Sequence, residues 1–497
     1  MDPRPTIARG TTGPVIIAGA SGFVGQALLE ALAARVPAVG LGRGAEPPAR
    51  LRGGSAGWRR CDLFSLRQAE EALAGAEVAV YLVHSMMPSS RLVQGRFQDL
   101  DLICADNFAR AARVRGVKRI IYLGGLIPDI PPGQLSEHLR SRREVEVALA
   151  GHGVPLVALR AGLVIGAHGS SFDMLARLVR RLPVMLCPAW TQTLTQPIAL
   201  DDVVQLLSFA VMHPEVGAGV YDVGGPDVLS YRDLMGLVAD QLGVRRRLVP
   251  VPLFSPGFSR LWVSLVTGAP RALVAPLIQS LRHTMRAHDR RLQELAGVPG
   301  QPVRLAVARA LTSVRPAAAP PDVPPGDPRR RQRELRRDRR VRSVQRLPLP
   351  HGQTAAAVAQ TYLRWLPRFF ASWLRADVDD AAATPRLCRF RLRGLRRPVL
   401  VMQFAPERSP PDRPLFYVTG GTLALPPARG RLEFREMTDE RGGARFLLAA
   451  LHDFVPRLPW WLYQATQAWV HVWTMNSFAR YLGRPTRGPA APAARSR

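Results

Sequence analysis

Three glycines near the start of the chain have a spacing that suits the binding of an anion. Gly19, Gly22 and Gly25 lie in VIIAGASGFVGQALLEAL, where a strand-like apolar run is followed by a helical one. In such a unit the first glycine allows a tight turn, the second lets a pyrophosphate approach the backbone, and the third lets helix and strand pack closely. The free N–H groups and the helix dipole at Ser21–Phe23 would face the anion. The stretch therefore predicts a dinucleotide-binding turn; the alternative is a glycine-rich turn without a ligand.

An arginine stands where the sequence would choose between NAD and NADP. About 20 residues beyond the glycines, an NAD site usually carries an acidic residue that binds the ribose. Here the stretch AVGLGRGAE places Arg43 at the end of the next predicted strand. A guanidinium can bind a 2′-phosphate through two parallel hydrogen bonds. We expect NADP as the cofactor, with NAD as second choice, unless Arg43 is an ordinary surface residue.

A histidine and an arginine with helical spacing form the candidate catalytic pair. His138 and Arg142 lie in LSEHLRSRREVE, four residues apart and therefore on one helix face. Histidine can act as a general acid near neutral pH, and a nearby arginine lowers its pKa by disfavouring the charged form. Arginine can hold a ribose hydroxyl but cannot shuttle a proton. The alternative is a structural histidine on a helix surface.

The elements that would position these residues alternate between strands and helices from residue 14 to about residue 300. PVIIAGA, AVGLGR, EVAVYLV, KRIIYLGG and PLVALRAGLVIG read as strands with helical stretches between them. Such alternation predicts an α/β fold, a doubly wound parallel Rossmann sheet covered on both faces. The carboxyl ends of its strands, and hence the ligand, would share one edge. His84 and Ser85 follow one of these strands, so we expect them near the nicotinamide.

These segments together resemble the short-chain dehydrogenase/reductase superfamily in its extended and atypical branches. The GxxGxxG spacing is typical of those branches, and TQPIALDDVVQLL and GVYDVGGPDVLSYRDLM resemble epimerase-like and NmrA-like members. YLVHSM, RIIYLGGL and LRAGLVIGAHGSSF are most similar to a bacterial group often called YbjT-like. The resemblance covers roughly residues 14–300 and implies an NAD(P)-binding oxidoreductase. In CDLFS, it places Asp62 and Leu63 beside the adenine.

The resemblance breaks at the catalytic positions. The superfamily uses a serine and a Tyr-x-x-x-Lys motif, and here Gly125, His138 and Arg142 stand at the serine, tyrosine and lysine positions. The resemblance implies His138 as proton donor and Arg142 as the residue that holds the nicotinamide ribose. The expected substrate is a hydrophobic carbonyl or quinone-like molecule. The alternative is a redox sensor or assembly protein that binds NADP(H) without turning over a substrate. The residues assigned to the cofactor are Gly19, Ser21, Gly22, Phe23, Val24, Gly25, Arg43, Asp62, Leu63, His84, Ser85 and Arg142.

The second half of the chain has a different pattern. Residues 315–341 are rich in proline and then in arginine, and predict a linker between a domain at 14–314 and a domain at 342–484. Residues 1–13 and 485–497 are expected to be disordered. The second domain resembles the helix-grip folds of the polyketide-cyclase and START-like superfamily, α+β folds in which a sheet wraps a long C-terminal helix.

The predicted C-terminal helix, over about 457–482, is rich in tryptophan. A stripe at helical spacing is expected to line an apolar cavity or to pack in the core. A third interpretation rests this helix on a membrane surface. The residues of the stripe are Trp461, Ala465, Ala468 or Trp469, Val472 and Met475.

Composition limits the choice of partners and compartment. The 497 residues carry a net charge of +30, but Lys118 is the only lysine, a pattern typical of arginine-rich coding that weakens the case for nucleic-acid binding. The four cysteines lie far apart and without metal-ligand spacing, which favours a reduced, cytoplasmic protein. Apolar stretches near 253–281 and 455–482 are interrupted by arginine or proline, so any membrane contact is expected to be peripheral.

Overall fold

The computed structural model describes residues 11–84 except 12, 92–251, 280–313, 340–378 except 372, 387–426, 430–439 and 443–484. The chain forms two compact units, which are described separately below: Met1–Met86 with Leu100–Asp327 (unit 1), and Met87–Asp99 with Pro328–Arg497 (unit 2). Ser85 and all but the last two residues of the predicted linker lie outside the described residues. Among the described helices, none is long and apolar enough to cross a membrane.

Unit 1 is built on a parallel sheet of seven strands, which confirms the predicted Rossmann fold. The strand order is β12-β7-β6-β4-β1-β2-β3, and all the pairings are parallel. The order reverses between β1 and β4, which is where such sheets bind ligands. The strands are β1 (Val15–Ala18), β2 (Ala38–Gly42), β3 (Gly57–Arg60), β4 (Val78–Tyr81), β6 (Arg119–Gly125), β7 (Leu156–Ala161) and β12 (Gly219–Val223).

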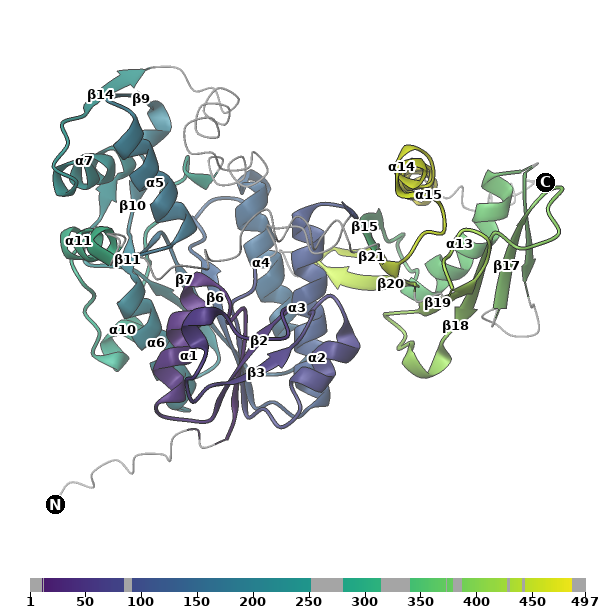
Figure 1. Ribbon diagram of the computed structural model, residues 1–497, viewed down its shortest axis with the longest axis horizontal. Helices are drawn as coiled ribbons and strands as arrows, with labels where there is room; N and C mark the ends of the chain where they lie inside the picture. Colours follow the sequence, from purple (N-terminus) through teal and green to yellow (C-terminus); the bar gives the residue numbers. More distant parts are fainter. Residues whose placement is uncertain are drawn as a thin grey trace, which may run out of the picture. The chain divides into compact units, whose positions relative to one another are not determined.

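Helices cover both faces of this sheet (Figure 1). On one face lie α1 (Phe23–Ala33), α6 (Leu200–Met212) and α10 (Arg291–Ala296); on the other lie α2 (Leu66–Ala72), α3 (Phe97–Val114) and α4 (Glu137–Ala150). Strands β1 and β4 are buried at every residue. They are therefore continuous apolar runs rather than alternating ones, as expected for strands covered on both faces.

A second group of elements in unit 1 encloses its own apolar cluster. The helices are α5 (Ser170–Arg181), α7 (Tyr231–Gln241) and α11 (Val303–Ser313). Short strands connect them: β8 (Val164–Ile165), β9 (Val184–Pro188), β10 (Leu194–Thr195), β11 (Ile198–Ala199), β13 (Leu229–Ser230) and β14 (Arg247–Val251). Between β9 and β10 lies the short 3-10 helix η3 (Ala189–Gln192).

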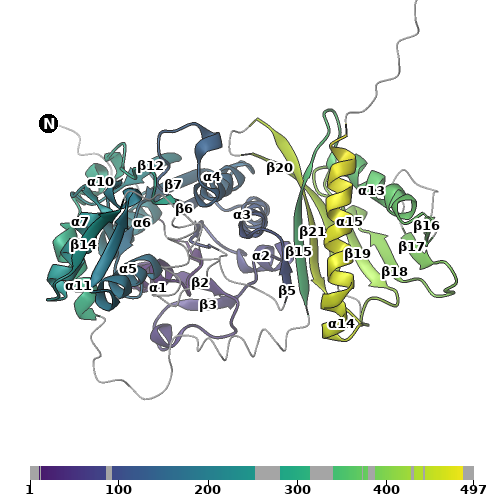
Figure 2. The ribbon, with the colours of Figure 1, turned by 90° about the horizontal axis from the view of Figure 1, so that it is seen from above.

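Unit 2 is an eight-stranded sheet with helices packed against it, shown from above in Figure 2. The strand order is β16-β17-β18-β19-β20-β21-β15-β5. The helices are α13 (Ala355–Phe369), α14 (Trp460–Ala465) and α15 (Gln467–Leu482). The strands are β16 (Leu374–Val378), β17 (Leu387–Leu392), β18 (Leu400–Phe404), β19 (Leu415–Gly420), β20 (Arg431–Thr438), β21 (Arg445–Phe454), β15 (Val341–Pro348) and β5 (Leu92–Gln94).

The edge strand β5 departs from the sequence-based domain boundaries. It comes from the stretch between β4 and α3 of unit 1, yet it pairs in parallel with β15, with Leu92 opposite Val341. The remaining pairs of the sheet are antiparallel. A contiguous first domain over 14–314 therefore does not describe the chain, because residues 87–99 belong to unit 2.

The core of unit 2 shows which face of the last helix is turned inward. Ala468, Met475 and Phe478 are buried against the sheet and α13, whereas Trp461 and Trp469 are exposed. The expected inward stripe is therefore wrong at Trp461 and Ala465, which are exposed, whereas of the alternatives Ala468 and Trp469 it is Ala468 that packs inward. The predicted single helix is also divided at Thr466, whose φ of −130° and ψ of −82° are not helical.

Candidate functional site

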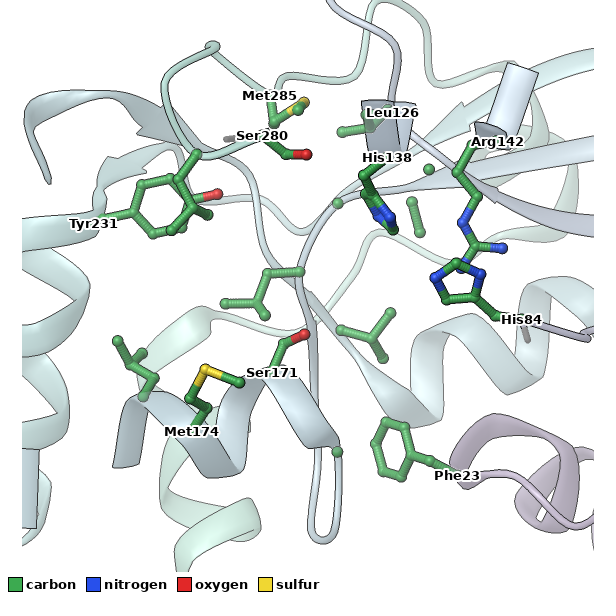
Figure 3. Close-up of a pocket in the computed structure, with 18 of the residues that line it drawn as sticks. Phe23, His84, Leu126, His138, Arg142, Ser171, Met174, Tyr231, Ser280 and Met285 are labelled. Carbon is green, nitrogen blue, oxygen red and sulfur yellow. The ribbon is translucent and has the colours of Figure 1, made fainter. Parts of the chain in front are cut away.

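A pocket of about 440 Å³ lies where the central parallel strands of unit 1 end (Figure 3). Gly19 follows β1, His84 follows β4, Gly125 ends β6 and Ala161 ends β7, and all four residues line the pocket. These are strand ends on either side of the reversal in strand order, which is the expected ligand edge of such a sheet.

The glycine turn forms one wall and leaves no room for side chains. Gly19 has a φ of +85°, and a Cβ there would lie 2.8 Å from the carbonyl oxygen of Leu82. A Cβ on Gly25 would overlap the carbonyl oxygen of Gly19. Helix α1 begins at Phe23 without a side-chain cap at Gly22, so the N–H groups of its first turn are available to an anion. The turn therefore fits a pyrophosphate.

The predicted adenosine-binding residues lie at two neighbouring strand ends rather than in the pocket. Arg43 follows β2 and is exposed, with no hydrogen bond or ion pair to any residue in the described part of the chain. Asp62 lies beyond β3, and its Oδ1 accepts a hydrogen bond from the Phe64 N–H at 3.2 Å. The Cys61 N–H donates to the Gly42 carbonyl at 2.8 Å and holds the two strand ends together. Leu63, also predicted here, is buried.

A second arginine lies at this edge, and the sequence reading did not identify it. Arg60, the last residue of β3, pairs in register with Gly42, the residue that precedes Arg43. Its side chain is exposed. Arg60 could be recognised only from the register between the parallel strands β2 and β3, which the sequence alone does not give. Two exposed arginines therefore stand at the neighbouring ends of β2 and β3.

The predicted catalytic pair does meet inside the pocket, together with His84. The rings of His84 and His138 lie with centroids 5.2 Å apart and planes inclined by 61°. Asp101 of α3 holds His84 through an Nδ1–Oδ2 contact of 2.8 Å. Figure 3 shows Arg142 beside both imidazoles, reaching down from the same helix as His138. The structure thus brings together His84, His138 and Arg142; Ser85 lies outside the described residues and Ser21 is exposed outside the pocket lining.

The surroundings of the two histidines favour their neutral forms. Burial, reinforced by the positive charge of Arg142 and by His84, holds the pKa of His138 well below its usual 6.5. Burial and Arg142 also lower the pKa of His84, although Asp101 opposes them. The buried Nδ1 of His138 has no hydrogen-bond partner among the described residues. His138, which lines the pocket, is therefore held as a neutral imidazole at neutral pH.

Tyr122 does not take the place of the tyrosine that the resemblance would put at position 138. Tyr122 on β6 donates its hydroxyl to the carbonyl oxygen of Arg142 at 3.3 Å, and burial raises its pKa to about 12. Gly125, at the serine position, has open space beside it, because a Cβ there would come no closer than 3.8 Å to Cγ of Arg142. The site therefore lacks the usual acid but keeps the room for a serine.

The far half of the pocket is apolar and was not identified from the sequence. Figure 3 shows Tyr231 across the pocket from His138, with its hydroxyl directed inward. Ser230 and Asp233 form a capping box that fixes Tyr231 at the first position of α7. Burial raises the pKa of Tyr231, so its hydroxyl stays protonated at neutral pH. The apolar lining consists of Met174, Leu175, Leu178, Met185, Leu186, Trp190, Met235 and Met285.

Comparison with known proteins finds a similar family for the first part of the chain. Residues 15–224 match the NAD dependent epimerase/dehydratase family. Among curated proteins, the chain is 30% identical over 111 residues to the auxiliary protein GraX of Staphylococcus aureus. That alignment spans 22% of this chain and 36% of the relative, so it covers about a third of that protein's length.

Several solved structures are similar over 59–60% of the chain. A nucleoside-diphosphate-sugar epimerase from Staphylococcus aureus is 16% identical, with 99% of that chain covered and a TM-score of 0.48. The NADPH complex of a quinone oxidoreductase from Escherichia coli is 20% identical, with 99% covered and a TM-score of 0.49. A triphenylmethane reductase from Citrobacter sp. is 16% identical, with 99% covered and a TM-score of 0.48.

Proposed function

We propose that the protein is an NADP(H)-dependent reductase of an apolar, conjugated acceptor of the quinone class. One observation carries the proposal: the glycine turn and the apolar chamber line the same pocket, with a neutral histidine between them. Pockets that are largely apolar and contain a few converging polar groups are the usual form of small-molecule sites.

Different residues would bind different parts of the dinucleotide. The N–H groups of the α1 first turn bind the pyrophosphate. Arg43, at the end of β2, would bind the 2′-phosphate together with Arg60 at the end of β3, which would select NADP over NAD. Arg142 would hold the nicotinamide ribose, and it keeps positive charge close to the two histidines. When bound, the nicotinamide supplies a hydride to the acceptor.

The state of His138 points to the class of acceptor. A simple ketone becomes a strongly basic alkoxide on reduction, so its reduction needs a proton donor poised beside the oxygen. A neutral imidazole can donate an N–H hydrogen bond to a substrate oxygen but is a weak acid. A quinone or enone delocalises the charge that it gains and takes its proton later from water. Without the tyrosine and lysine, reduction of a conjugated acceptor can therefore still proceed, whereas reduction of a simple ketone should be slow.

A turnover assay tests the proposal. NADPH consumption is followed by absorbance with a benzoquinone, a naphthoquinone and an aliphatic ketone of similar size. We expect turnover with the quinones and little with the ketone. Gly25→Ala, which places a methyl group on the Gly19 carbonyl, should abolish both binding and turnover. Gly217→Ala is the matched control, because nothing lies within 4 Å of its Cβ. Equal rates with ketone and quinone would reject the acceptor class.

A second candidate function is favoured by the connection between the two units. The chain leaves unit 1 just beyond His84 and contributes β5 to the sheet of unit 2, then returns at Leu100, next to Asp101. His84 and Asp101, which stand before and after this segment in the sequence, are hydrogen-bonded to each other, and His84 lines the pocket. A non-catalytic sensor of NADP(H) could pass its ligand state to unit 2 by this route. Slower hydrogen exchange in β5 and β15 on adding NADPH, without turnover of any quinone, would favour the sensor.

We also propose that unit 2 is of helix-grip type. Its antiparallel strands hold α15 across one face, as such a fold requires (Figure 2). In this proposal unit 2 supports the reductase by recruiting hydrophobic molecules. Removal of unit 2 is not a clean test, because β5 is part of it. Instead, native mass spectrometry of the freshly purified full chain should find NADP(H) and an apolar molecule retained together.

A further inference from the structure

Helices α14 and α15 carry exposed tryptophans on the outside of unit 2. Trp461, Trp469 and Trp473 are 71%, 73% and 51% exposed, and Trp373, just beyond α13, is 72% exposed. Trp469 and Trp473 are one helical turn apart and so lie on one side of α15. With the 46% exposed Val470, these residues form what we call the aromatic face. Clustered apolar side chains in water mark an interaction surface.

The aromatic face is anchored by packing within unit 2. The Trp473 ring lies 4.7 Å from the Phe369 ring and 6.0 Å from the Phe370 ring. Phe369 in turn stacks on Trp365 at 4.5 Å, and Trp365 contacts the buried Phe478 of α15. Trp473 is thus the outer end of a chain of aromatic contacts that begins in the core. This part of the face is preformed, so a partner need not order it on binding.

The helices that carry the aromatic face contain basic residues and no acidic ones. Residues 342–376 and 455–484, which include α13, α14 and α15, contain no aspartate and no glutamate. Over the larger range 328–497, 32 arginines stand against 12 acidic residues, so this third of the chain holds +20 of the net charge of +30. The exposed arginines of these helices and their flanks are Arg364, Arg368, Arg375, Arg457, Arg480 and Arg484.

We propose that the aromatic face docks onto the headgroup region of an anionic lipid bilayer. Tryptophan side chains are favoured at the boundary between headgroups and acyl chains, and arginines are attracted to anionic lipids. Along α15 the aromatic and the basic residues are separated: Trp469 and Trp473 lie in the first half of the helix, and Arg480 lies in its last turn. The helix would therefore rest in the membrane surface, with rings inserted and arginines among the phosphates.

Two other occupants fit the same surface less well. A second copy of the chain would bring two arginine-rich faces together, and their like charges would repel. Single-stranded nucleic acid would be attracted by the arginines and could stack on the rings. However, the face also contains Val470 and lies on the outside of a helix, whereas strand-binding proteins use a basic groove that follows the phosphates.

Vesicle sedimentation of the full-length protein tests the docking. The probes are phosphatidylcholine vesicles and vesicles of phosphatidylcholine mixed with phosphatidylglycerol. We expect binding to the mixed vesicles, weakened by salt, and little binding to phosphatidylcholine alone. The double variant Trp461→Ala/Trp469→Ala removes the two most exposed rings of α14 and α15, which leaves the core intact, and should lower partitioning by roughly tenfold or more. Leu295→Ala, at a 63% exposed apolar residue of unit 1, is the control.

A charge-matched pair separates local attraction from overall charge. Arg480→Gln/Arg484→Gln should weaken binding, whereas Arg245→Gln/Arg247→Gln in unit 1 removes the same charge and should not. Absence of binding to mixed vesicles, or binding unchanged in the tryptophan variant, would overturn the proposal. The proposal would also be overturned if the protein self-associated without vesicles, or bound oligonucleotides, and the tryptophan variant abolished that association or binding. The assay contains no NADP(H) or acceptor, so failure of the reductase proposal would leave its result unaffected.

Discussion

The imidazole of His138 packs edge-on against that of His84, with ring centroids 5.2 Å apart, and burial, Arg142 and His84 all lower its pKa. In contrast, His84 is held by Asp101 at 2.8 Å. The two histidines therefore differ in role. His84 is positioned by a carboxylate, whereas His138 is surrounded by groups that oppose its protonation. This asymmetry makes His138 the group available to a substrate oxygen.

The pH dependence of turnover should reveal the neutral state of His138. Because burial and Arg142 hold its pKa well below 6.5, the imidazole stays neutral from about pH 6 to pH 8, and its titration contributes no change in rate there. His138→Gln, which keeps an N–H donor, should retain much of the turnover with a quinone, and His138→Phe should lose roughly tenfold or more. Initial rates across this range provide the measurement. A rate that falls as pH rises through 6.5 and becomes flat in His138→Gln would mean that the protonated form is the donor.

Arg43→Ala should weaken NADPH more than NADH. The substitution removes a charged partner of the 2′-phosphate, a loss of about 1.5–3 kcal/mol, so the Kd for NADPH should rise by roughly ten- to a hundredfold. The Kd for NADH should change little, since NADH has no phosphate at that position. Titration calorimetry with both nucleotides measures the difference. Arg67→Ala, at another exposed arginine of unit 1, controls for the loss of one positive charge; equal weakening of both nucleotides would remove Arg43 from the site.

Unit 2 should lose stability in acid because of one buried carboxylate. Burial would raise the pKa of Glu433, but Arg435, His452 and Arg413 outweigh it and hold the pKa well below 4.5. The stabilisation is complete above pH 4.5 and is lost as pH falls below it. Burial also lowers the pKa of His452, so the unfolded chain takes up its proton first and stability begins to fall below about pH 6.5.

Replacement of Glu433 isolates this effect. Glu433→Gln leaves Arg413 and Arg435 buried without their counter-charge and should cost about 3–5 kcal/mol of unfolding free energy. Glu436→Gln, two residues along β20 from the buried Phe434, breaks an ion pair with the half-exposed Arg445 and is the control. Thermal unfolding followed by tryptophan fluorescence reports mainly on unit 2, which holds six of the nine tryptophans. Similar losses in the two variants would contradict the assignment.

The dinucleotide-binding part of the fold could be predicted from the sequence because it depends on interactions between residues that are close together in the chain. A strand, a glycine turn and a helix are adjacent in the chain, so their pattern fixes both structure and ligand. The same holds for His138 and Arg142, which share a helix face by spacing alone. The role of these site residues stays a prediction, but the position of the glycine turn at a strand end and of His138 and Arg142 on one helix follows from the pattern.

The sequence could not predict features that depend on distant pairing. Strand β5 has only three residues, and its partner Val341 is about 250 positions away, so no local signal marks it. Tyr231 comes into the pocket from a helix that follows the sheet strands. The stripe on α15 failed for another reason: helical spacing shows which residues share a face but not which face is buried. Ala468 and Met475 are turned inward and Trp469 outward, a choice made by packing against α13.

Restoring the superfamily's catalytic residues should change the substrate range. Gly125 has room for a side chain, since a Cβ there would meet only Cγ of Arg142 at 3.8 Å, so Gly125→Ser should fold with little loss of stability. Combined with His138→Tyr and Arg142→Lys, it would supply a carbonyl-orienting hydroxyl, an acid and a cation that lowers the pKa of that acid. Aliphatic ketone reduction should then rise at least about tenfold above wild type, as expected when a general acid is gained. Gly125→Ser alone is the control, because it adds the hydroxyl without an acid. If the triple variant binds NADPH and still leaves the ketone untouched, the missing residues are not what limits the wild-type protein to conjugated acceptors.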